Sequence, residues 1–264
     1  MRGRRPRLSQ HFLHDRRTAR RIAESLRAPA GARVLEIGPG EGALTEHLLD
    51  RGWRVVAVEM DAALAAALER RWPAGELTVV RGDALDYEPD GEGPLYAIGN
   101  LPYAVTSPLL FHLLELADRI EIPEIVVMVQ REVAERLAAS PGSRAYGALT
   151  VGVGLSAQVE LLFDVGRGQF RPPPRVRSTV ARLVPGGPPG LDPDRRERVR
   201  RLVRTAFEQR RKQLRNSLKA ELEVSLAGAA REKTVAGIGL ERRPETLSIE
   251  EWMRFEAALS DPSF

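Results

Sequence analysis

The chain has 264 residues and a formal net charge of +4, with 43% hydrophobic and 29% charged residues, a composition typical of a globular protein with one large and one small domain. The absence of cysteine excludes disulfides and thiolate metal sites. Because there is no signal peptide and no apolar run of about eighteen residues, we expect a cytoplasmic protein without a membrane segment. No metal site is expected either, since the four histidines are scattered: His11, His14, His47 and His112.

Positive charge is concentrated in two stretches of the chain. Residues 1–30 carry nine arginines against two acids, and residues 195–219 carry eleven basic residues against two acids. An even scatter of arginine over the surface would not produce this pattern. Clusters of this kind bind polyanions, and contacts to phosphates supply much of the affinity of proteins for nucleic acids. We therefore expect a nucleic-acid partner.

The first half of the chain predicts a nucleotide-binding unit. A helix over residues 16–26, with Asp15 as its N-cap, precedes a strand over 33–37 and a glycine-rich loop. After the next helix, a strand over 54–58 ends at Glu59, 21 residues beyond Gly38. In such a unit Gly38 and Gly40 let a ligand approach the backbone, and the acid pairs with ribose hydroxyls.

Two classes of cofactor fit these glycines, because the spacing also satisfies the dinucleotide fingerprint. Three features favour S-adenosylmethionine. Glu36 lies where it could orient the loop or meet the ammonium group of the cofactor, and Asp83, beyond a strand over 77–80, suits an adenine amine. A further strand over 95–98 leads into a corner that lacks the acid–base pair needed for hydride transfer.

That corner, Asn100-Leu101-Pro102-Tyr103, is where we place the chemistry. Proline fixes its own φ and holds the preceding residue extended, so the neighbouring carbonyls have a set direction. The corner offers an amide oxygen, exposed carbonyls and one aromatic face. These groups suit a flat ring with an exocyclic amine. A plain strand-to-helix turn is the alternative interpretation of this segment.

The second half of the chain completes the sheet and adds a helical domain. We predict a strand over 125–130, a helix over 131–137, two strands within 148–163 and a last strand over 178–184. Residues 169–176 form a stiff loop that either exposes Phe170 or packs it inward. A linker over 185–193 then separates a catalytic domain, 1–184, from a small all-helical domain, 194–264, that we expect to bind RNA.

Several motifs together resemble one family, the KsgA-type small-subunit ribosomal RNA adenine N6,N6-dimethyltransferases. The resemblance covers nearly the whole chain. The motifs are Gln10-His11-Phe12-Leu13-x-Asp15, Glu36-Ile37-Gly38-Pro39-Gly40-x-Gly42, Gly99-Asn100-Leu101-Pro102-Tyr103, Ser143-Arg144-Ala145-Tyr146-Gly147, Phe170-x-Pro172-Pro173-Pro174, Gln209-Arg210-Arg211-Lys212-x-Leu214-Arg215-Asn216 and Arg243-Pro244-Glu245-Thr246-Leu247-Ser248. Position 11 is His, where many members of the family have Asn.

The resemblance implies an α/β fold, a Rossmann-like class I S-adenosylmethionine-dependent methyltransferase sheet flanked by helices. It implies cofactor contacts by His11, Leu13, Gly38, Glu59, Asp83 and Asn100; the glycine-loop argument adds Gly40. The implied substrate is a pair of adjacent adenosines in the hairpin loop near the 3′ end of 16S ribosomal RNA, in a small-subunit precursor. We expect the enzyme to be a monomer.

For catalysis we expect Asn100 and a carbonyl at Leu101 or Pro102 to accept the N6 hydrogens of adenine. Tyr103 and Phe170 would hold the two faces of the extruded base. Three alternatives stay open. They are a large-subunit (23S) ribosomal RNA adenine methyltransferase of the macrolide-resistance type, a mainly non-catalytic ribosome-assembly factor, and a nicotinamide dehydrogenase.

Overall fold

The computed structural model describes residues 11–72, 75, 77–91, 93–225 and 237–260. The motif residues before His11 lie outside this range. The described chain forms two compact units. Within the described ranges, the first comprises residues 11–134 and 158–185, and the second comprises residues 135–157 and 186–260.

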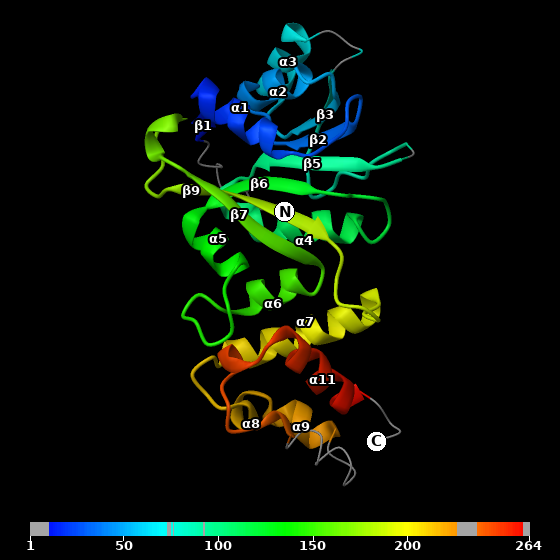
Figure 1. The fold of residues 1–264 in the computed structure, drawn as a ribbon, viewed down its shortest axis with the longest axis vertical. Helices are drawn as coiled ribbons and strands as arrows, with labels where there is room; N and C mark the ends of the chain where they lie inside the picture. Colours follow the sequence, from blue (N-terminus) through cyan, green and yellow to red (C-terminus); the bar gives the residue numbers. More distant parts are fainter. Residues whose placement is uncertain (1–10, 73–74, 76, 92, 226–236, 261–264) are drawn as a thin grey trace, which may run out of the picture. The chain divides into compact units, whose positions relative to one another are not determined.

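The first unit is built on a seven-stranded sheet (Figure 1) with the order β4-β3-β2-β5-β6-β9-β7. Strands β4, β3, β2, β5 and β6 are parallel, and β9 runs antiparallel to β6. The strands are β2 (Arg33–Ile37), β3 (Arg54–Glu59), β4 (Leu77–Arg81), β5 (Leu95–Asn100), β6 (Ile125–Gln130), β7 (Ala157–Val165) and β9 (Ser178–Pro185). The strand order reverses between β2 and β5, and ligands of open parallel sheets bind at such a point, outside the carboxyl ends of the strands.

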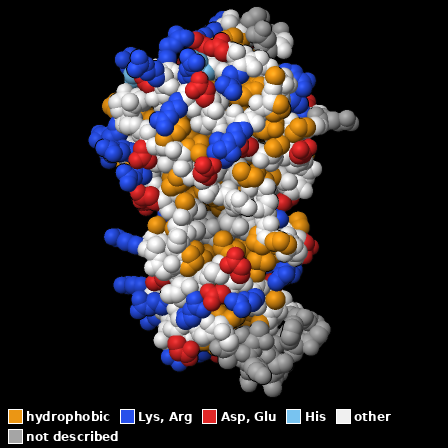
Figure 2. Space-filling view, viewed as in Figure 1, with side chains coloured by type: hydrophobic (Ala, Val, Ile, Leu, Met, Phe, Trp, Pro, Cys, Tyr) orange, Lys and Arg blue, Asp and Glu red, His pale blue; other side chains and the backbone are white. Residues whose placement is uncertain are grey.

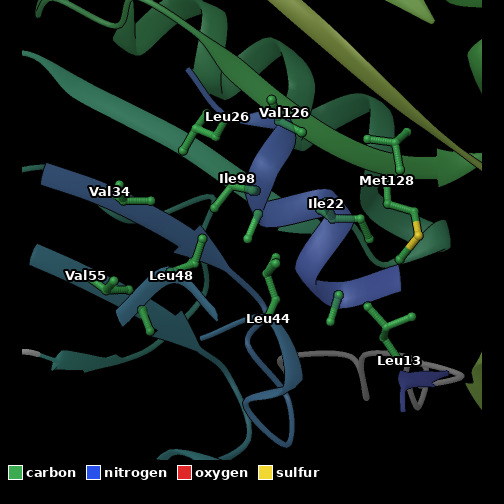
Figure 3. Packing of buried hydrophobic residues seen from close by; sticks show 14 of the residues in the cluster. Leu13, Ile22, Leu26, Val34, Leu44, Leu48, Val55, Ile98, Val126 and Met128 are labelled. Atoms are coloured by element: carbon green, nitrogen blue, oxygen red, sulfur yellow. The ribbon is translucent and has the colours of Figure 1, made fainter. Parts of the chain in front are cut away.

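Helices pack on both faces of this sheet. On one face lie α1 (Arg16–Ser25), α2 (Ala43–Leu49) and α3 (Ala62–Arg71), and α4 (Thr106–Leu116) lies on the other side of β5 and β6 (Figure 1). The side chain of Asp15 caps α1 by accepting a hydrogen bond from the Thr18 amide at 2.7 Å, as predicted. In Figure 3 Ile22 of α1 and Leu26, which directly follows this helix, lie among residues of the central strands. Their burial fixes the segment that precedes α1 at the carboxyl edge of the sheet.

A two-stranded ribbon adds to this edge. Strand β1 (Phe12–Leu13) pairs antiparallel with β8 (Phe170–Arg171), so that Leu13 faces Phe170. The amide of His14 also donates to the Gln169 carbonyl at 2.9 Å. The ribbon joins two parts of the chain that lie about 160 residues apart in sequence.

The second unit is helical. Its helices are α6 (Ala148–Gly154), α7 (Pro193–Glu208), α8 (Leu214–Ser217), α9 (Lys219–Ser225) and α11 (Ile249–Ser260), and α5 (Arg131–Leu137) crosses the boundary between the units. Trp252 and Phe255 are fully buried at its centre. The hydroxyl of Tyr146 donates to the Leu247 carbonyl at 2.7 Å, which joins two of the motifs of the sequence analysis.

Two predictions for this region are wrong. Residues 148–154 form helix α6 instead of a strand, because a short run that is buried on all sides has no informative periodicity. Residues 135–157 belong to the C-terminal unit instead of the domain predicted over 1–184. The reason is that Val151 and Leu155 are buried in the same core as Val199 and Val203.

A buried ion pair connects the C-terminal end of α1 to the sheet. Arg182 Nε on β9 lies 3.2 Å from Glu124 Oε2, and both side chains are less than a tenth exposed. The same guanidinium donates to the Ser25 carbonyl at the end of α1, and Glu124 accepts from the amide of Arg27. The pair therefore satisfies backbone groups where α1 ends.

We expect Arg182→Ala to lower the free energy of unfolding by about 3–5 kcal/mol, because the Glu124 carboxylate would stay buried without its cation. The double variant Arg182→Met/Glu124→Leu should lose much less, since no charge is left buried. Urea denaturation of both variants tests this. Equal losses would show that the buried charge does not set the stability of this region.

Candidate active site

One cavity opens at the carboxyl edge of the sheet, where the strand order reverses. Its lining includes every residue predicted to contact the cofactor: His11, Leu13, Gly38, Gly40, Glu59, Asp83 and Asn100. It also includes three further residues of the predicted chemistry: Leu101, Pro102 and Tyr103. Segments from five parts of the sequence therefore meet around a single space.

The glycine loop between β2 and α2 forms one wall of the cavity. Gly40 has a left-handed φ of 58°, and a Cβ atom there would lie 3.0 Å from the ring of Phe12. The Gly40 amide donates to Glu59 Oε2 at 3.0 Å, and the Asp61 amide donates to Glu59 Oε1 at 2.9 Å. The carboxylate at the end of β3 is thus held in place by backbone donors, with its remaining lone pairs available to a ligand.

Glu36 is a buried acid beneath this loop. Its side chain is 1% exposed and accepts a hydrogen bond from Thr45 Oγ1 at 2.7 Å. The pKa of Glu36 is raised to about 8, mainly by burial; the Thr45 hydrogen bond lowers this pKa and the nearby charge of Glu59 raises it. Since Glu36 lines the cavity, a cationic group bound there would be stabilised by the ionised carboxylate.

The corner after β5 forms the opposite wall. The Leu101 amide donates to the Met128 carbonyl at 3.1 Å, which fixes the corner to β6. The Pro102 carbonyl already accepts from the Val105 amide at 3.1 Å and from Thr106 Oγ1 at 3.0 Å. Among the described residues no hydrogen bond is formed with the Leu101 carbonyl. Of the two carbonyls considered in the sequence analysis, that of Leu101 is therefore the available acceptor.

The amide of Asn100 is oriented by the N-terminal segment. Asn100 Nδ2 donates to the His11 carbonyl at 3.3 Å, so Oδ1 is left as an acceptor. Tyr103 lies beside it, with its hydroxyl 3.2 Å from Ser178 Oγ. The ring centroid of Tyr103 is 5.7 Å from that of His11, and the two rings are tilted by 38°.

The exposed position considered for Phe170 is wrong. Its side chain is 2% exposed, belongs to the buried core of the first unit and does not line the cavity. The reason is its place in β8, where it faces Leu13 of β1 and packs inward. The ring beside Tyr103 in this structure is that of His11.

Sequence reasoning missed part of the lining. Phe12, Met60 and Met128 also line the cavity, and Met60 is 45% exposed. A signal was present for two of them, because Phe12 lies inside the N-terminal motif and Met60 directly follows Glu59. Met128 gave no signal, since an apolar residue in a buried strand is expected in any sheet.

The described residues offer neither a metal site nor a helix that spans a membrane. They contain no cluster of three or more His, Asp or Glu side chains that could hold a metal ion. No helix among them is long and apolar enough to cross a membrane.

The fold and the site define a class of protein. A parallel sheet with an antiparallel strand next to β6, a glycine loop after β2, an acid at the end of β3 and another after β4 is the arrangement of class I S-adenosylmethionine-dependent methyltransferases. The residues present fit that cofactor, because a glycine cradle, a buried carboxyl and two strand-end acids line one cavity.

Comparison with known proteins identifies the family. Residues 1–261 match the family model described as ribosomal RNA adenine dimethylase. The chain is 43% identical to "Ribosomal RNA small subunit methyltransferase A" of Acinetobacter baylyi, over 97% of this chain and 91% of the relative. It is 42% identical to the protein of the same name from Pseudomonas aeruginosa, over 97% and 95%. The chain therefore belongs to the ribosomal RNA adenine dimethylase family and is an S-adenosylmethionine-dependent enzyme.

Solved structures show the same fold. A dimethyladenosine transferase from Plasmodium falciparum superimposes with a TM-score of 0.78 at 25% identity, covering 93% of this chain and 96% of that one. The 23S rRNA methyltransferase ErmE superimposes with a TM-score of 0.67 at 30% identity, covering 95% and 100%. These likenesses extend over both compact units.

The buried acid generates a prediction about pH. The folded chain keeps a proton on Glu36 up to pH about 8, whereas the unfolded chain releases it near its ordinary value of 4.5. The folded state thus binds more protons between these limits, and its stability falls as the pH rises through them. Glu36→Gln cannot titrate and its amide oxygen still accepts from Thr45, so the variant should lack this contribution.

Urea unfolding without cofactor at pH 5, 6.5 and 8 measures the effect. We expect the wild type to lose stability relative to Glu36→Gln as the pH rises. Parallel pH profiles for the two proteins would contradict a buried, protonated Glu36.

Proposed function

We propose that this protein transfers methyl groups from S-adenosylmethionine to N6 of two adjacent adenosines in the hairpin loop near the 3′ end of 16S ribosomal RNA, two groups to each. The observation that carries the proposal is the single cavity where the predicted cofactor residues meet the corner Asn100–Tyr103. The choice of RNA is supported by relatives at 42–43% identity that are named for the small ribosomal subunit.

The cofactor would occupy the side of the cavity formed by β2, β3 and β4. When bound, S-adenosylmethionine supplies an electrophilic methyl group on a sulfonium. The glycine loop admits the ligand to the backbone, Glu59 accepts from ribose hydroxyls and Asp83 accepts from the adenine amine. Glu36 meets the ammonium group, directly or through water, and His11 and Leu13 cover the ligand.

The target base would enter from the side of Asn100. Its N6 lone pair is delocalised into the ring, which makes it a poor nucleophile. In the first transfer Asn100 Oδ1 and the Leu101 carbonyl accept the two N6 hydrogens, which favours a more tetrahedral nitrogen and aims its lone pair into the cavity. In the second transfer N6 has one hydrogen left, and one of these two oxygens accepts it. No strong base is needed, because the nitrogen becomes acidic once it is alkylated.

Stacking would hold the extruded base. Tyr103 offers one ring face, and base–aromatic stacking contributes about 1–3 kcal/mol. Phe170 is withdrawn into the core in this structure, so we assign it no contact with the base. The His11 ring lies beside that of Tyr103, too close and too tilted for a base to lie between the two rings, so Tyr103 alone is assigned a stacking contact.

A large-subunit substrate is the second candidate, because ErmE shares the fold at 30% identity. One assay separates the two. Purified protein is incubated with labelled S-adenosylmethionine and unmethylated small or large ribosomal subunits, and labelled RNA fragments are analysed by mass spectrometry. We expect dimethyladenosine in the 16S fragment. Label confined to 23S RNA would support the second candidate, and no label in either RNA would refute the proposal.

We expect Asn100→Ala to lower kcat by about 100-fold or more, because N6 loses the acceptor that orients it. Asn100→Asp should also be impaired, since it keeps an acceptor but loses the donor to His11. Thermal stability and the circular dichroism spectrum show whether the fold is intact. A folded Asn100→Ala protein with wild-type turnover would contradict the role of this residue.

A further inference from the structure

The loop from Arg171 to Ser178 borders the cavity at both of its ends. At one end the Pro172 carbonyl lies 2.8 Å from His11 Nδ1. At the other end Ser178 Oγ lies 3.2 Å from the Tyr103 hydroxyl. His11 and Tyr103 both line the cavity, so the residues between these contacts are held close to its opening.

This loop is held in one conformation by its own contacts. Three consecutive prolines restrict its backbone, and Arg167 Nε donates to the Pro174 carbonyl at 2.8 Å. The Arg177 carbonyl accepts from the Arg131 amide at 3.0 Å. Binding of a ligand would therefore cost this loop little conformational entropy.

The loop presents three arginines to solvent. Arg171, Arg175 and Arg177 are exposed, and among the described residues none has an acidic or hydrogen-bonding partner for its guanidinium. Figure 2 shows Lys and Arg side chains gathered at the upper left, where Figure 1 draws β1 and the segment that leads into β9. The acid next to the loop, Asp164, is already engaged by Thr179 Oγ1 at 2.7 Å.

Elsewhere on the same unit several exposed arginines are neutralised. Arg16 and Arg71 share Glu46, and Arg119 lies 2.9 Å from Glu88. The lack of an acidic partner at the loop is therefore not a property of every arginine of this unit.

We propose that Arg171, Arg175 and Arg177 bind the phosphates on either side of the adenosine that enters the cavity. The proposal rests on the proposed function, because a base taken out of its stack must pass its sugar–phosphate backbone across the opening. Guanidinium groups suit this partner, since their planar donors bind phosphate oxygens in pairs. An acidic ribosomal protein is the other partner that such a loop could meet, and the test below separates the two.

The test compares two double variants of the full chain. Arg175→Ala/Arg177→Ala removes two charges from the loop. The control, Arg51→Ala/Arg54→Ala, removes two charges just before and at the first residue of β3. This amino end of the strand lies opposite the carboxyl edge that holds the cavity. Both variants and the wild type are assayed for methylation of unmethylated small subunits, for affinity for protein-free 16S RNA at several salt concentrations, and for cofactor affinity.

We expect the loop variant to raise KM for the subunits about tenfold, with kcat changed less than twofold and cofactor affinity unchanged. Its affinity for protein-free RNA should fall, and the slope of log affinity against log salt should decrease by about 1.4, or about 0.7 for each lost phosphate contact. The control should resemble the wild type.

Two results would overturn the inference. One is a loop variant that binds RNA like the control. The other is a variant with a raised KM for subunits but unchanged affinity for protein-free RNA, which would assign the loop to a ribosomal protein. If the wild type methylates neither RNA, the proposed function fails, and the RNA-binding comparison still decides the role of the loop.

Discussion

The site depends on how closely β5 approaches β2. In the parallel register Ile37 pairs with Gly99, and a Cβ atom at position 99 would lie 2.6 Å from the Ile37 carbonyl oxygen. Any other residue would force the two strands apart at the point where both end. Because Gly99 allows this approach, the glycine loop after β2 and Asn100 at the end of β5 face one cavity: a Cβ at Gly38 would be 3.8 Å from the Asn100 carbonyl. The two halves of the proposed reaction meet through this contact.

The second constraint comes from the N-terminal segment. The β1–β8 ribbon and the buried face of α1 hold this segment at the site. Its His11 carbonyl accepts a hydrogen bond from the side-chain amide of Asn100. One short segment thus covers the cavity and orients the side chain that we place at the reacting nitrogen. The loop after β8 is joined to the same segment through His11 and Pro172, so the arginine-bearing edge and the cavity form one structure.

Much of this arrangement could be predicted from the sequence. The carboxyl ends of parallel strands meet at one edge of a sheet. The sequence pattern alone therefore predicts that Glu59, Asp83 and Asn100 lie at this edge. The helix at 148–154 was missed because a short, fully buried apolar run looks the same as a buried strand. The burial of Phe170 depends on the long-range pairing with Leu13, which no local pattern reports. The occupied carbonyl of Pro102 has a local cause instead, because its donors, Val105 and Thr106, lie three and four residues further along the chain.

The most direct test of this account is a crystal structure of the protein with S-adenosylhomocysteine and a short RNA that presents an unpaired adenosine. The account predicts that N6 of that adenosine lies within hydrogen-bond distance of Asn100 Oδ1 and the Leu101 carbonyl, with its free side turned toward the sulfur of the ligand beside the glycine loop. An adenosine held away from Asn100, or a ligand bound outside the cavity between β2 and β5, would contradict it.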